Sequence, residues 1–119
     1  MNHKPNPVLE KSTTFALRII NMYKFLSEQK REYILSKQTL ISGTEVGAYV
    51  TTAQEADNRA IFHQDMNIAL RKAERTKYWL KLLFESEYLE EKVFTSLNSD
   101  CVELIRLLTA ITKTTRNSI

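Results

Sequence analysis

The segment Phe62–Leu83, FHQDMNIALRKAERTKYWLKLL, carries the most regular hydrophobic pattern of the chain and decides its fold. Seven residues of this segment recur at alternating steps of four and three: Phe62, Met66, Ala69, Ala73, Thr76, Leu80 and Leu83. In an α-helix this spacing puts all seven on one side, as along the seam of a helix bundle. We therefore expect a helix over residues 58–86, with Asp57 or Asn58 as its N-cap.

Three further segments also show helical spacing, and we expect helices over residues 8–28, 33–56 and 90–115. The first begins near Pro7, which suits an initial helical turn because its missing N–H would have no partner there. Its core stripe is Phe15, Ile19, Met22 and Leu26. The core stripe of the last is Val93, Leu97, Cys101, Leu104, Leu108 and Ile111. Apolar residues of the second spread around most of its circumference, which is typical of a helix buried on several sides.

The composition favours a helical fold. The chain has 119 residues, 43% of them hydrophobic and 26% charged, which are ordinary values for one globular domain. It contains only two glycines and two prolines, and both prolines lie within the first seven residues. Because helix breakers are so rare, we expect an all-α fold: one domain over residues 1–119, built as an antiparallel up-down-up-down four-helix bundle. Residues 1–6 are expected to form a disordered tail.

The same sequence argues for a cytoplasmic protein that does not enter a membrane. No apolar run reaches the roughly 18 residues that a transmembrane helix needs, and the polar N-terminal stretch lacks the apolar core of a signal peptide. Cys101 is the only cysteine, so no internal disulfide can form. The net charge of +3 permits an anionic partner without requiring one.

Candidate catalytic and metal-binding residues are few. A di-iron bundle needs Glu-x-x-His pairs, but Ala60 stands three residues before His63, and the other histidine, His3, lies in the predicted tail. Cys101 falls on an apolar stripe, where a small core residue is the simplest interpretation, since a nucleophile would need a base beside it. No phosphate-binding loop and no Ser-His-Asp signature occur. We therefore expect no enzymatic activity, no metal site and no cofactor.

A run of basic side chains on the predicted third helix is the strongest candidate binding site. The run comprises Arg71, Lys72, Arg75, Lys77 and Lys81, against the single acid Glu74. Arg71, Arg75 and Tyr78 fall on the side away from the core seam, where arginines can contact phosphates and a tyrosine can stack on a base. The alternative is a solvated, salt-bridging helix face or an oligomer contact. The candidate nucleic-acid-binding residues are Arg71, Lys72, Arg75 and Tyr78.

Two further patterns indicate close packing of helices, within the chain or between copies of it. Gly43 and Gly47 stand one turn apart on the second helix, where each costs about 1 kcal/mol relative to alanine, so a neighbouring helix is expected to pass close to them. Ile61, Ile68 and Trp79 lie roughly 90° from the seam of the third helix and form a second apolar face. We expect these five residues to serve oligomer contacts or close helix packing.

Four ordered groups of residues, one in each predicted helix, resemble the pattern of a known family. The first helix has Asn6-Pro7-Val8, Lys11-Ser12, Phe15-Ala16, Arg18-Ile19-Ile20 and Tyr23. The second has Ser42-Gly43-Thr44, Val46-Gly47-Ala48 and Glu55-Ala56. The third has Ile68-Ala69, Lys72-Ala73-Glu74, Thr76 and Tyr78-Trp79-Leu80, and the fourth has Glu103-Leu104, Leu107-Leu108-Thr109 and Lys113-Thr114. Together they resemble the 23S rRNA intervening-sequence protein family, also called four-helix bundle proteins, over nearly the whole chain.

Glu45 and Tyr49 depart from this family pattern, which usually has a small polar residue and an asparagine at these positions. The two changes put in doubt any site that the family shares on the second helix.

The resemblance implies a small bacterial bundle protein that assembles as a ring-like homopentamer, without enzymatic activity or cofactor. Some members are encoded inside intervening sequences of 23S rRNA genes, and a related branch accompanies retroelements, where it binds nucleic acid and the reverse transcriptase. We therefore hold three hypotheses: an accessory protein that binds RNA or DNA, an oligomeric scaffold for a partner protein, and a mobile-element remnant with little role.

Overall fold

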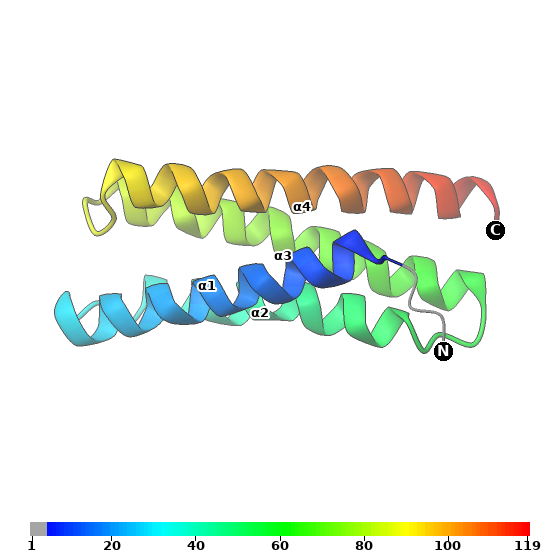
Figure 1. Ribbon diagram of the computed structural model, residues 1–119, viewed down its shortest axis with the longest axis horizontal. Helices are drawn as coiled ribbons and strands as arrows, with labels where there is room; N and C mark the ends of the chain where they lie inside the picture. Colours follow the sequence, from blue (N-terminus) through cyan, green and yellow to red (C-terminus); the bar gives the residue numbers. More distant parts are fainter. Residues whose placement is uncertain (1–4) are drawn as a thin grey trace.

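Four long helices make up almost all of the protein. The computed structural model describes residues 5–119, with helices α1 (Pro7–Gln29), α2 (Leu35–Ala53), α3 (Arg59–Glu85) and α4 (Glu91–Asn117). Each helix runs antiparallel to the one before it, which gives an elongated up-down-up-down bundle of 45 × 30 × 22 Å (Figure 1). No strand occurs among the described residues. The all-α four-helix prediction is confirmed.

Asn6, the last residue of the predicted disordered tail, begins the ordered part of the chain. Residues 1–4 lie outside the described residues, but Asn6 has a defined structural role. Its side chain accepts a hydrogen bond from the backbone N–H of Leu9 (3.2 Å) and donates one to Oε1 of Gln54 (3.0 Å). Asn6 is therefore the N-cap of α1 and joins it to the end of α2, whereas the sequence placed this residue in the tail.

The connection before α2 explains why this helix begins two residues later than predicted. The carboxylate of buried Glu32 accepts hydrogen bonds from three backbone N–H groups, those of Ile34, Leu35 and Ser36. These contacts fix the first turn of α2 at Leu35, because they satisfy N–H groups that have no partner within the helix. The helix also ends earlier than residue 56, at Ala53.

The other helices begin and end close to the predicted bounds. Asn58, the second of the two predicted caps, accepts a hydrogen bond from the backbone N–H of Ile61 (2.9 Å). Glu90 precedes α4 without a side-chain cap, and α4 continues two residues beyond 115 to Asn117.

The predicted seam of α3 lies in the core of the bundle. Met66, Ala69, Ala73, Thr76, Leu80 and Leu83 are all buried, and Phe62 is partly buried at one end. The predicted stripe of α4 is also buried from Leu97 to Leu108, but Val93 is 42% exposed. Among residues 5–119, none of the helices has the length and the apolar character that crossing a bilayer requires.

Candidate nucleic-acid interface

Basic side chains of α3 and α4 face outward on neighbouring parts of the bundle. The register between the two helices is set by the contacts of His63 with Thr115 (2.6 Å) and of Cys101 with the carbonyl oxygen of Ala73 (3.2 Å). In this antiparallel register, Arg106 of α4 lies level with Arg71 of α3. We call five of these exposed residues the α3–α4 basic surface: Arg71, Arg75, Arg106, Lys113 and Arg116.

Three of the predicted nucleic-acid-binding residues lie on this side of α3. Arg71 is exposed and pairs with Glu74 one turn further along the helix (2.9 Å). Such surface pairs are weak, so the guanidinium stays available to a phosphate. Arg75 is also exposed. Tyr78 is 54% exposed, and its ring lies 5.3 Å from that of Trp79.

Lys72 has a different position. Its ammonium lies 3.4 Å from the carboxylate of Glu45 on α2, and both side chains are half-buried. Neighbours in a helix point about 100° apart, so Lys72 faces α2 although it follows Arg71 in the sequence. We therefore leave Lys72 out of the interface. Glu45, one of the two departures from the family pattern, has a structural partner in Lys72.

The α4 part of the basic surface was missed by the sequence analysis. The signal was present in two forms. After Glu103 the chain has three basic residues and no acidic one. Arg106, Lys113 and Arg116 are also seven and three residues apart, which is a helical spacing.

The two glycines of α2 pack against α1 of the same chain. A Cβ atom at Gly43 would lie 3.0 Å from Cγ2 of Ile19, and one at Gly47 would lie 3.4 Å from the backbone oxygen of Ser12. Both glycines are buried, so they serve helix packing inside one chain rather than a free surface.

The second apolar face of α3 lies on the side of α2. Ile61 is 40% exposed, and Ile68 and Trp79 are partly buried. The indole N–H of Trp79 is buried and has no hydrogen-bond acceptor among residues 5–119. This face therefore keeps apolar surface and one polar donor that contacts within the described chain do not use.

The residues considered for catalysis have structural partners instead. Cys101 is buried and donates its thiol hydrogen to the carbonyl oxygen of Ala73, and burial raises its pKa to about 12. A thiol with this pKa stays protonated at neutral pH and is a poor nucleophile. His63 contacts Thr115, which follows Cys101 on α4 by 14 residues, or about 21 Å along the helix axis. No group of metal-ligating side chains occurs in the described part of the chain.

Comparison with known proteins finds a family and a solved structure that this chain resembles. The sequence model of the family described as 23S rRNA-intervening sequence protein matches residues 4–110. A crystal structure of a protein of unknown function from the S23 ribosomal protein family of Bacteroides thetaiotaomicron VPI-5482 is 45% identical, with a TM-score of 0.88. The match covers 89% of this chain and 98% of that one. Among curated proteins, none matches this chain.

Proposed function

This chain belongs to the 23S rRNA-intervening sequence protein family, and from this premise we propose that it is a non-enzymatic, self-associating accessory protein that binds nucleic acid. The α3–α4 basic surface is the observation that carries the proposal. RNA is the favoured ligand because the family is defined by an RNA gene, and duplex DNA is the alternative. We place the protein in the bacterial cytoplasm as part of the same proposal, because 23S rRNA is found there.

The chemistry of this surface suits the phosphate backbone more than individual bases. Arg71 and Arg106 lie level on adjacent helices, while Lys113 and Arg116 continue the positive charge toward the end of α4. Basic side chains that neutralise phosphates release counterions, so binding becomes salt-dependent and largely independent of sequence. Tyr78 is the one exposed aromatic side chain beside these charges on α3, and it offers a stacking surface for an unpaired base.

Self-association is proposed through the second apolar face of α3. Exposed Ile61, together with partly buried Ile68 and Trp79, would be covered by another copy, and an acceptor from that copy would satisfy the indole N–H. The pentameric number rests on the family resemblance alone. Light scattering on the wild type and on Ile61→Glu/Ile68→Glu tests it: a pentamer that dissociates in the variant is the expected result.

The binding proposal is tested by fluorescence anisotropy with a structured RNA and a DNA duplex over a salt series. Arg71→Glu/Arg106→Glu should weaken binding more than tenfold at low salt and reduce the salt slope by about two, one for each lost phosphate contact. The control is Lys24→Glu/Lys37→Glu, which changes the net charge equally at exposed positions of α1 and α2. Equal loss in both variants would exclude a local site, and no binding by the wild type would exclude the function.

A protein-interaction scaffold is the second candidate, and the outer side of α1 and α2 favours it. Leu17 of α1 and Ile41 of α2 are exposed there, and Ile34, which directly precedes α2, is 76% exposed. If nucleic acid does not bind, a pull-down that loses a specific protein when Ile34 and Ile41 are replaced by glutamate would support the scaffold. If the wild type binds neither nucleic acid nor a specific protein, the remaining hypothesis is that the chain is a mobile-element remnant.

A further inference from the structure

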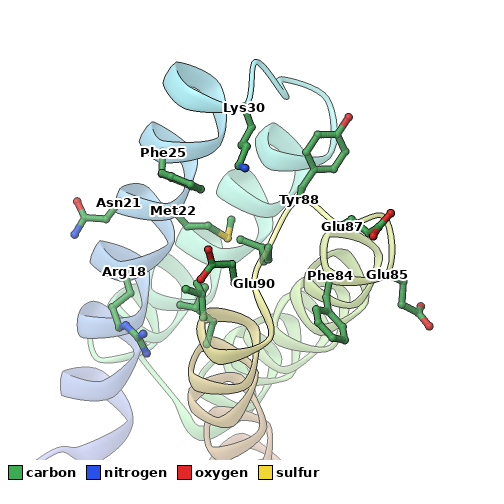
Figure 2. Close-up of a pocket in the computed structure, with 13 residues that line it drawn as sticks. Arg18, Asn21, Met22, Phe25, Lys30, Phe84, Glu85, Glu87, Tyr88 and Glu90 are labelled. Carbon is green, nitrogen blue, oxygen red and sulfur yellow. The ribbon is translucent and has the colours of Figure 1, made fainter.

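A cavity of about 900 Å³ opens between α1, α4 and the turn that joins α3 to α4 (Figure 2). Its size falls in the range of small-molecule sites, which often lie between the helices of bundles. Buried Met22, Leu89 and Leu97 line it, and Phe25 and Val93 are 46% and 42% exposed. A ligand in this cavity would remove apolar surface from water, which is the main source of affinity for a small organic molecule.

The cavity exists because α1 and α4 are held together along only part of their length. Lys11 near the beginning of α1 pairs with Glu103, and Arg18 at the middle of α1 pairs with Asp100. Beyond Arg18 the two helices diverge (Figure 1), and no ion pair among the described residues joins them there. The space between their diverging ends is the cavity.

Charges at the rim discriminate between possible ligands. The guanidinium of Arg18 is already used, because it donates to both Asp100 and Ser96. Three lining residues are exposed carboxylates, and none of them forms an ion pair within residues 5–119: Glu85, Glu87 and Glu90. Lys30 is the only other basic residue of the lining. Carboxylates outnumber free cationic groups among the lining residues, so the direction of each carboxylate decides whether it can contact a ligand.

Figure 2 shows which of these groups face the cavity. The Glu90 side chain points toward α1 and Lys30 points in from the opposite side, whereas Glu85 and Glu87 are directed away from α1. The Lys30 ammonium lies 5.9 Å from the centre of the Phe25 ring, so an aromatic surface that attracts cations is already present at the rim. A ligand amine could take the place of Lys30 over this ring and face Glu90.

We propose that this cavity binds small organic amines that carry an aromatic or aliphatic body. The body packs on Met22, Val93 and Leu97, and the protonated amine contacts Glu90 and the ring of Phe25. The site is independent of the proposed nucleic-acid surface, since no residue of the α3–α4 basic surface lines it.

The chain offers a simple probe of occupancy, because it has only three methionines. Met22 lines the cavity, Met66 is fully buried in the core, and Met1 is at the N-terminus. In a protein labelled at the methionine methyl carbons, three NMR signals report on these places, and a Met22→Leu variant assigns the first. Phenethylamine, 2-phenylethanol and 3-phenylpropanoate are matched probes with cationic, neutral and anionic heads.

We expect phenethylamine at millimolar concentration to shift the NMR signal of Met22 and to leave that of Met66 nearly unchanged. Glu90→Gln should weaken phenethylamine by about threefold, the usual effect of one partly exposed charge pair, and leave 2-phenylethanol unaffected. Lys30→Met should tighten phenethylamine, since it removes the competing cation. Glu55→Gln, an exposed acid at the opposite end of the bundle, is the matched control and should change nothing.

Val93→Trp should abolish the Met22 response by filling the mouth, with circular dichroism verifying its fold. Tighter binding of 3-phenylpropanoate than of phenethylamine would overturn the proposal. Tighter phenethylamine binding by Glu90→Gln, or weaker binding by Lys30→Met, would overturn it as well. A Met22 signal that no probe moves would also overturn it. If the position of the Met22 signal instead changed with protein concentration in the absence of a probe, the occupant would be a second copy of the chain. The proposal would then fail as well.

Discussion

Helix α1 has two neighbours, and it packs on them in opposite ways. Toward α2 the contact is close: Gly43 lets Ile19 approach to a distance that almost no side chain permits, and Gly47 rests on the backbone of Ser12. Toward α4, α1 is held by exposed ion pairs and then diverges to leave the cavity. One side of α1 is fixed by shape and the other by charge, so the same helix combines a rigid contact with an open site.

The α1–α2 and α3–α4 connections, at the end of the bundle that holds the cavity, differ in a similar way. The α1–α2 connection contains buried Glu32, whose carboxylate caps the next helix. The α3–α4 connection has no such cap at Glu90, and it contains Glu87 in the left-handed region (φ 69°). Arg31 in the α1–α2 connection is also left-handed (φ 53°), so both turns carry the strain of this conformation. The missing side-chain cap at Glu90 is therefore what distinguishes them.

The largest effect on stability is expected from a bulky side chain in the close contact between α1 and α2. Gly43→Leu would push its side chain into fully buried Ile19, and overpacking of this kind costs about 3 kcal/mol. We expect this loss in the free energy of unfolding by urea. Gly47→Ala is the control, because its Cβ would make ordinary contacts and alanine gains about 1 kcal/mol in helix propensity. Equal effects at the two glycines would show that the close approach is not local to Ile19.

The next effect concerns Glu32. Glu32→Ala would leave three backbone N–H groups of α2 without an acceptor and should cost about 2 kcal/mol in the free energy of unfolding. Burial by itself would raise the pKa of Glu32, but the hydrogen bonds from these N–H groups outweigh it and lower the pKa.

The pH dependence follows from this lowered pKa. The contribution of Glu32 is present above its unfolded pKa of about 4.3 and is lost as the pH falls through the folded value. Wild type should therefore lose more stability between neutral and acidic pH than Glu32→Gln does. Parallel stability curves would contradict the capping role.

A smaller, stabilising effect is expected at Glu87, in the α3–α4 connection beside the cavity. Glu87→Gly would remove the strain of the left-handed conformation and should raise the free energy of unfolding by about 1 kcal/mol. Arg31, which has φ 53° in the α1–α2 connection, is the matched position, and Arg31→Gly should stabilise by a similar amount. If Glu87→Gly were destabilising, the side chain of Glu87 would have a role at the cavity rim that outweighs its strain.

The close side of α1 was more predictable than the open side, for a physical reason. Two glycines inside a helical pattern have few explanations other than close packing, and the seam of α3 repeats at a spacing that only a helix produces. The sequence left open whether the glycines faced another helix of the chain or another copy, since spacing does not name the partner. Geometry supplied that answer through Ile19 and Ser12.

The cavity could not be predicted because it depends on how far two helices diverge. Val93 fits the stripe of α4 in the sequence, but it is exposed because α1 has moved away at its level. The same holds for Lys72 and the basic surface. The sequence shows that Lys72 is charged, but the direction of its side chain depends on its ion pair with Glu45 of another helix. The charge of Arg106 and its helical spacing to Lys113 and Arg116 were visible in the sequence, but its position level with Arg71 follows from the register of α3 and α4.

The smallest effect is expected for the ion pairs that hold α1 to α4. Arg18 and Asp100 are each more than one third exposed, so their coupling energy in a double-mutant cycle of Arg18→Ala and Asp100→Ala should stay below about 1 kcal/mol and fall with added salt. The open side of α1 would then be fixed weakly, as its divergence suggests. A coupling energy as large as the loss in Gly43→Leu would instead mean that charge fixes α1 as firmly as shape does. The cavity would then be a rigid feature of the bundle rather than the consequence of a loosely held helix.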